Sequence, residues 1–183
     1  DPQACPDPVK GGGRVVLQCA ELSQPKRSIL GAEQEQWLFQ DLRRSPRQWK
    51  LLGQSSLIAS TRIDSPLGKT TYTDGWDGYP MTRRRLLEVV ADARLSDVVT
   101  LGGDVHMNVA SVLRLEPNDP QSAPLASEFV TTSISSRGMS EQLLSAIRLS
   151  NPDLQYARAD ERGQQRVVHV DRRTPRSEEH TSE

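Results

Sequence analysis

The stretch Val98-Val-Thr-Leu-Gly-Gly-Asp-Val-His106 determines how the fold of this chain is interpreted. Its first four residues are apolar or β-branched and predict a short buried strand, and the two glycines predict a sharp turn at the end of that strand. In α/β proteins, ligands collect at the carboxyl ends of strands. The sequence therefore predicts that Asp104 and His106 lie at such an edge of a sheet.

Asp104 and His106 are two residues apart, so on an extended segment both side chains point to the same side. A carboxylate with an imidazole suits iron, zinc or manganese, and a carboxylate alone suits calcium or magnesium. The alternative is that Asp104 forms a turn and His106 is a partly exposed surface residue. Two ligands do not complete a metal site, because metals take four or more.

A second candidate lies in Asp74-Gly-Trp-Asp-Gly-Tyr-Pro80, an acidic and aromatic loop before a predicted helix. Asp77 is compatible with three roles: a metal ligand, an acceptor that orients a ligating histidine, or a helix cap. Trp76 and Tyr79 are interpreted as the local core of the loop. A third segment, residues 127–136, ends in a cluster of hydroxyls that either surrounds an anionic substrate or, as we favour, forms ordinary turns.

The remaining pattern alternates helices with strands, which indicates an α/β layered fold. We expect helices over residues 31–44, 81–94 and 139–149, the second of them beginning after Pro80 and burying Leu86, Leu87, Val90 and Ala91. Residues 61–80 are rich in Gly and Pro and are predicted to form one long loop. Strands are expected at 15–17, 49–59, 98–101, 109–115, 127–132 and 166–170.

Composition limits the classes of function. The 183 residues carry 23 basic and 24 acidic side chains, a net charge of −1, which argues against nucleic-acid binding driven by a basic surplus. The run Arg83-Arg84-Arg85 is interpreted as a solvated face. No apolar stretch approaches the ~20 residues that span a bilayer, so no transmembrane segment is expected.

The hydrophobic content is low for one self-sufficient domain. Only 35% of the residues are hydrophobic and the mean hydropathy is −0.59. This composition suggests that another part of a longer polypeptide covers some faces of the fold. Since residue 1 is not methionine, we expect the natural start to lie upstream.

Cys5 and Cys19 are compatible with a disulfide, which would indicate an oxidising compartment, or with two reduced thiols. Zinc is disfavoured because no CxxC spacing is present. Residues 176–183, Arg-Ser-Glu-Glu-His-Thr-Ser-Glu, resemble the translation of a sequencing adapter. We therefore expect one domain over residues 1–175 and a non-native tail that excludes His180 from any site.

In combination, these segments resemble the PhoD-like alkaline phosphatases of the metallophosphoesterase superfamily. The resemblance is carried by five segments in family order and ends near Asn151-Pro152: residues 27–38, 49–54, Trp76-Asp-Gly-Tyr-Pro80, Gly103-Asp-Val-His106 and residues 128–136. Asp104 and His106 match the last metal-site motif of the family, and Asp77 matches its Trp-Asp-Gly-Tyr loop. Asp153 stands where a histidine often follows Asn-Pro, so no active-site role is expected for it.

The resemblance implies the C-terminal half of a sandwich of mixed sheets flanked by helices, incomplete in this chain. It implies metal-dependent hydrolysis of phosphate monoesters and diesters, with iron and calcium as cofactors and a secreted or periplasmic parent protein. The other ligands of the family are expected upstream of Asp1, so no catalytic residue is assigned here and the N-terminal half is needed for activity. The alternatives are a phosphodiesterase or phospholipase D-like hydrolase, and a non-catalytic secreted binding module.

Overall fold

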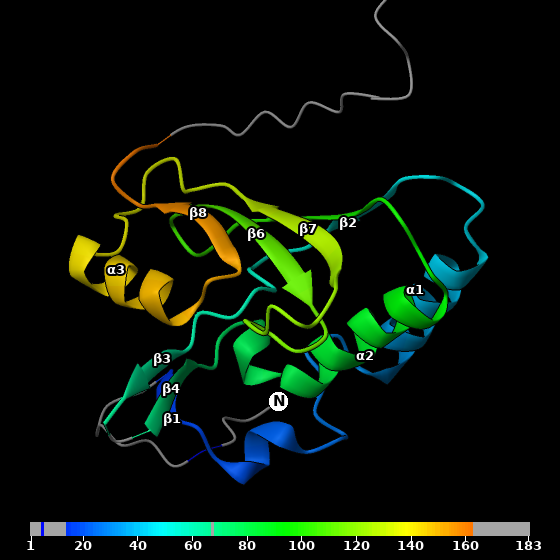
Figure 1. The fold of residues 1–183 in the computed structure, drawn as a ribbon, viewed down its shortest axis with the longest axis horizontal. Coiled ribbons are helices and arrows are strands. Elements are labelled where there is room, and N and C mark those ends of the chain that lie inside the picture. Colours follow the sequence, from blue (N-terminus) through cyan, green and yellow to red (C-terminus); the bar gives the residue numbers. More distant parts are fainter. Residues whose placement is uncertain (1–4, 6–13, 67, 163–183) are drawn as a thin grey trace, which may run out of the picture.

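The computed structural model describes residues 5, 14–66 and 68–162, which form an α/β structure around a large mixed sheet (Figure 1). The strand order of this sheet is β2-β5-β7-β6-β8, in which β2, β5 and β7 are parallel and β6 is antiparallel to both β7 and β8. The predicted α/β class with mixed sheets and flanking helices is confirmed. The strands are β2 Lys50–Gly53, β5 Val98–Gly102, β6 Asn108–Arg114, β7 Pro124–Val130 and β8 Leu154–Arg158.

A smaller antiparallel sheet with the order β1-β4-β3 lies below the large one in Figure 1. Its strands are β1 Val15–Leu17, β3 Ile63–Ser65 and β4 Gly68–Tyr72. Next to it, a disulfide joins Cys5 to Cys19 and packs with Val16 and Leu22 in a small separate core. The disulfide interpretation of the two cysteines is therefore confirmed.

The three predicted helices are present as α1 Ala32–Arg44, α2 Pro80–Asp92 and α3 Glu141–Ser150. Charge order explains α1, because Glu33 and Glu35 lie in its first turn and Arg43 and Arg44 in its last, as the helix dipole favours. Pro80 opens α2, where its missing N–H is not needed. Ser140 caps the start of α3, because its side chain accepts a hydrogen bond from the backbone N–H of Leu143.

One face of the large sheet is covered by other parts of the fold, which we call the closed face. The other, the open face, carries solvent-exposed side chains. Along the closed face, Thr100, Glu128 and Ser111 are register partners on β5, β7 and β6, and all three are buried. The helices and the small sheet lie on this side in Figure 1. Along the open face, Leu101, Phe129, Ala110 and Tyr156 form a row of register partners, in which Leu101 is 42% and Tyr156 43% exposed.

The structure corrects several sequence predictions. Residues 61–80 are not one loop, because β3, β4 and the 3-10 helix Trp76–Gly78 form within them. The β-branched residues Ile63 and Thr70 pair across this hairpin, and Thr71 pairs with Val16 on β1. The prediction gave too much weight to the neighbouring Gly and Pro. Residues 54–59 do not extend β2, and β8 was missed. The predicted strand at 166–170 and the tail 176–183 lie outside the described residues.

Arg83-Arg84-Arg85 is not a solvated face, because Arg83 is 5% exposed. Arg85 forms an ion pair of 2.7 Å with the buried Glu35, and only Arg84 follows the prediction, with exposed partners. No helix within the described part of the chain has the length and apolar character needed to cross a bilayer.

Candidate functional site

Four segments meet at one edge of the large sheet. β2, β5, β7 and β8 point the same way, so the residues that follow them gather at their shared carboxyl edge. These segments are residues 54–61, 103–107, 131–139 and 159–162. Asp104 and His106 belong to the second of them, as the sequence predicted.

Close backbone contact fixes the end of β5 against the segment after β2. A methyl group placed on Gly102 would lie 2.0 Å from the carbonyl oxygen of Ser56. Only glycine therefore permits this approach without a shift of the backbone. The first of the two glycines in the motif thus has a steric role, because it allows residues 103–107 to begin beside residues 54–56.

Asp104 and His106 do not lie on an extended segment, so the physical reason for their expected alignment was wrong. Both adopt left-handed backbone conformations, with φ of 67° at Asp104 and 55° at His106. Such a conformation costs a non-glycine residue about 1–2 kcal/mol and is concentrated at functional sites. Despite the turn, both residues line the same cavity, which has a volume of about 370 Å³.

The imidazole of His106 is oriented by the loop after β7. Its Nδ1 lies 3.1 Å from the carbonyl oxygen of Arg137. A carbonyl only accepts hydrogen bonds, so Nδ1 carries the proton of the neutral ring and Nε2 keeps its lone pair. This arrangement, with one ring nitrogen held by a backbone carbonyl, is typical of metal-binding histidines.

The loop that carries Arg137 is itself held in place. The backbone N–H of Thr132 donates to Oδ1 of the buried Asn108 at 3.2 Å. Arg162 donates to the carbonyl oxygens of Ile134 and Ser135 at 2.6 and 3.0 Å. At the end of the loop, a methyl group on Gly138 would lie 2.2 Å from the carbonyl oxygen of Ala159.

The carboxylate of Asp104 is exposed, and no hydrogen bond or ion pair engages it within the described residues. A free carboxylate oxygen and an oriented imidazole nitrogen on one cavity are a donor pair that fits iron, zinc or manganese. In the part of the chain that the structure describes, no further His, Cys, Asp or Glu forms a tight cluster with this pair. Any metal bound here therefore requires additional ligands.

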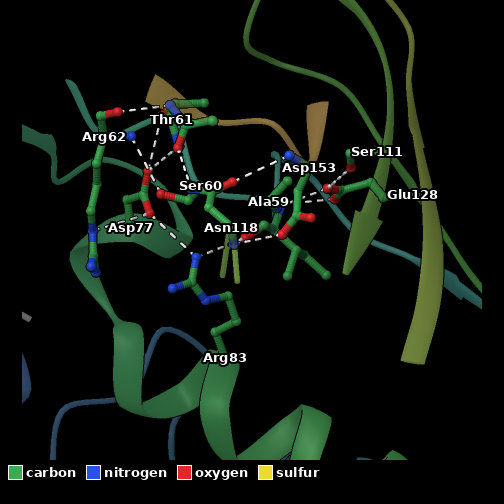
Figure 2. Close-up of polar contacts among 12 residues, drawn as sticks. Ala59, Ser60, Thr61, Arg62, Asp77, Arg83, Ser111, Asn118, Glu128 and Asp153 are labelled. Carbon is green, nitrogen blue, oxygen red and sulfur yellow. Dashed lines mark hydrogen bonds and ion pairs between the residues drawn. The ribbon is translucent and has the colours of Figure 1, made fainter. Parts of the chain in front are cut away.

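Asp77, the third candidate ligand, is buried and already has protein partners. It is 4% exposed, and its Oδ2 accepts hydrogen bonds from the backbone N–H and the hydroxyl of Thr61, at 2.7 and 2.9 Å. Its Oδ1 lies 3.4 Å from Arg83 and 3.6 Å from Arg62 (Figure 2). Both oxygens thus have protein partners, and Asp77 does not line the cavity of Asp104 and His106, whereas Thr61 does.

Glu128 is a polar core residue whose individual importance sequence reasoning missed. It is fully buried on β7, and it accepts hydrogen bonds from the backbone N–H groups of Ile58 and Ala59, at 2.7 and 2.8 Å, and from the hydroxyl of Ser111, at 3.1 Å (Figure 2). Burial raises the pKa of Glu128, because the charged form loses its hydration. The alternation of side chains along a strand could have predicted this burial, since Glu128 shares a face with Ala126 and Val130.

Glu128 and Asp77 hold the two ends of one segment. Glu128 binds the backbone at Ile58 and Ala59, and Asp77 binds Thr61, which faces the cavity. Arg83 lies between them and donates to the carbonyl oxygen of Ile58 at 3.5 Å. These buried polar side chains therefore fix the position of residues 58–61 at the cavity.

Asn151 and Asp153 lie away from the cavity. Asn151 is fully buried and donates to the carbonyl oxygens of Arg62 and Ile147, both at 2.7 Å. Asp153 forms an ion pair with Arg114 at 2.8 Å and accepts from the backbone N–H of Asn118. Both side chains connect the loop before β8 to neighbouring elements.

Comparison with known proteins identifies the family of this chain. The family model for "PhoD-like phosphatase" matches residues 1–177. Alkaline phosphatase D of Bacillus subtilis (strain 168) is 39% identical over 118 residues, which are 64% of this chain and 20% of that protein. A solved structure, described as the structure of PhoD, superposes with a TM-score of 0.71 at 35% identity and covers 81% of this chain and 29% of its own.

This chain thus spans 20% of the length of the curated relative and 29% of the solved structure. The family match extends over nearly all of its residues and includes the segment that carries Asp104 and His106. The chain belongs to the PhoD-like phosphatase family.

Proposed function

We propose that this chain supplies one part of the active site of a metal-dependent phosphate ester hydrolase, an alkaline phosphatase in its full-length form. The observation that carries the proposal is the pairing of Asp104 and His106 on one cavity at the carboxyl edge of the sheet. Asp104 contributes a free carboxylate and His106 an imidazole whose Nε2 is left available by the bond to Arg137. Membership of the PhoD-like phosphatase family supports the reaction class.

Iron and calcium are the metals that we propose for the complete site. An imidazole with a carboxylate suits iron, and a carboxylate oxygen suits calcium. When bound, such ions polarise the phosphoryl oxygens and lower the pKa of a water molecule. The residues of this chain hold ligands in position: Arg137 orients His106, and Asp77 and Glu128 fix the neighbouring segment that carries Thr61.

The remaining ligands come, in this proposal, from another part of the same polypeptide. Two ligands are too few for a metal ion, and the matched relatives are several times longer than this chain. The open face of the large sheet offers the missing part a surface, since Leu51 on the edge strand β2 is 65% exposed and Leu101 and Tyr156 are more than one third exposed. A disulfide between Cys5 and Cys19 is in keeping with a secreted or periplasmic protein.

The test is hydrolysis of p-nitrophenyl phosphate and bis(p-nitrophenyl) phosphate by the full-length protein and by this chain alone, each supplied with iron and calcium. We expect turnover by the full-length protein, its loss with a chelator, and none by the chain alone. Hydrolysis of the diester alone would assign the protein to the phosphodiesterases. No turnover of either ester by the metal-loaded full-length protein would support a binding module instead.

A further inference from the structure

The cavity beside Asp104 and His106 has two chemically different sides. Its polar lining residues are Asp104, His106 and the threonines Thr61, Thr70 and Thr71. Much of the rest is apolar and comes from β1, β3, β4, α3 and the loop before α3: Val15, Ile63, Tyr72, Leu143, Ile147 and Met139. The candidate metal ligands therefore adjoin an apolar surface.

The apolar wall is accessible from solvent. Leu143 on α3 is 44% exposed, Tyr72 at the end of β4 is 39% exposed, and Val15 on β1 is 53% exposed. The wall combines α3 with the small sheet, since α3 packs on β3 and β1 and β4 are neighbours in that sheet. Apolar side chains that converge from separate elements on an open cavity of about 370 Å³ are typical of a ligand site.

The charges around the cavity limit what can bind there. Among the residues described by the structure, no lysine or arginine lines it, and Asp104 is its one carboxylate. A second phosphate group or another polyanion would therefore find no lysine or arginine among the described lining residues. An uncharged alkyl or aryl group finds contacts with Leu143, Met139 and Ile147.

We propose that this cavity is the leaving-group subsite, which binds an uncharged alkyl or aryl group of a phosphate ester while its phosphate lies at Asp104 and His106. The inference rests on the proposed function. Hydrolysis adds water across the P–O bond and releases inorganic phosphate and the alcohol, and the apolar part of that alcohol occupies the wall formed by Leu143, Tyr72 and Val15. Preferred substrates are esters of apolar alcohols, ahead of nucleotides and sugar phosphates.

The experiment uses the metal-loaded full-length protein with ethyl, butyl and hexyl phosphate, whose leaving alcohols differ in chain length and little in reactivity. Each methylene that enters the apolar wall raises kcat/KM by about twofold to fourfold. Hexyl phosphate is therefore expected to exceed ethyl phosphate by more than about tenfold. Competition with ethylphosphonate and hexylphosphonate, which lack the scissile bond, measures the same preference as a difference in inhibition constants.

Leu143→Ser removes apolar surface from the wall, and Leu149→Ser is its matched control. Leu149 lies on the same helix, is 87% exposed and does not line the cavity. We expect Leu143→Ser to lower the hexyl-to-ethyl ratio by at least about threefold and Leu149→Ser to leave it unchanged.

The outcomes separate this inference from the proposed function. Equal kcat/KM for ethyl and hexyl phosphate would overturn the subsite while leaving the phosphatase intact. An unchanged ratio in Leu143→Ser would place the chain-length preference on another surface and would also overturn it. Failure to hydrolyse any ester would contradict the proposed function, and hexylphosphonate binding weakened by Leu143→Ser would still support the subsite in that case.

Discussion

Nδ1 of His106 lies 3.1 Å from the carbonyl oxygen of Arg137, a residue 31 positions later in the chain. This contact joins the turn after β5 to the loop after β7. It sets the protonated nitrogen of the neutral ring and leaves the lone pair of Nε2 available on a residue that lines the cavity. The orientation of the proposed ligand therefore depends on how firmly the loop of residues 131–139 is held.

Gly138→Ala tests that dependence. The added methyl group would lie 2.2 Å from the carbonyl oxygen of Ala159, so the loop must move and take the carbonyl of Arg137 with it. Loss of such an orienting contact typically weakens metal binding about 10- to 100-fold. We expect this loss in a metal titration of the full-length protein by isothermal calorimetry.

Ser135→Ala is the control for that experiment, because it changes an exposed side chain of the same loop without adding bulk. Its metal affinity is expected to equal that of the wild-type protein. Wild-type metal affinity in a folded Gly138→Ala variant would show that the loop does not orient His106.

The variant Asp77→Asn distinguishes two roles of Asp77, that of a metal ligand and that of a buried partner of Arg83. Asp77 balances the buried Arg83, and removing one partner of a buried ion pair costs about 3–5 kcal/mol. Chemical denaturation of the full-length protein is expected to show a loss of this order. Asp64→Ala, which removes an exposed partner of Lys69, is expected to change the midpoint little.

The metal content of the folded Asp77→Asn variant completes this test. Since Thr61 and two arginines already engage both oxygens, the number of bound metal ions should equal that of the wild-type protein. Loss of one ion per molecule would instead make Asp77 a ligand.

The raised pKa of Glu128 leads us to expect that the stability of the protein depends on pH. Burial raises its pKa above the ordinary value of 4.5, so the folded protein holds this proton more tightly than the unfolded chain. The stabilisation from this group is complete below pH 4.5 and is lost as the pH rises through the folded pKa. Glu128→Gln, which resembles the protonated side chain, removes this dependence.

The measurement is the melting temperature of the wild-type protein and of Glu128→Gln from roughly pH 5 to roughly pH 8. The wild-type value should fall relative to that of the variant as the pH rises. Glu33→Gln, at an exposed position on α1, should show a constant difference over the same range. A constant difference for Glu128→Gln as well would mean that its ionisation is the same in the folded and unfolded states.

Local patterns were sufficient for the helices and for most strands of the large sheet. Glu33 and Arg44 at opposite ends of α1, Pro80 at the start of α2 and the apolar run of β5 are signals contained in a few neighbouring residues. The pairing of β3 with β4 depends on residues that meet only after the chain folds back. The neighbouring Gly and Pro residues favoured the prediction of a loop instead of this strand pair.

The sequence placed Asp104 and His106 just after a strand at the carboxyl edge of the sheet, where the structure also has them. Their role as metal ligands stays a prediction, and their geometry could not be derived from the sequence. The left-handed conformations of Asp104 and His106 depend on the close approach of Gly102 to Ser56 and on the contact with Arg137, both of which join distant segments. The burial of Arg83 likewise depends on Asp77 in the preceding loop. A short basic run does not reveal such a partner.

The most direct test of the central claim is the metal content of the purified full-length protein, measured by inductively coupled plasma mass spectrometry. Asp104→Ala and His106→Ala are each expected to lose bound metal together with phosphate ester hydrolysis, and Asp92→Ala, a change at an exposed carboxylate on α2, is expected to retain both. Full metal content in both site variants would contradict the claim that Asp104 and His106 hold the metal.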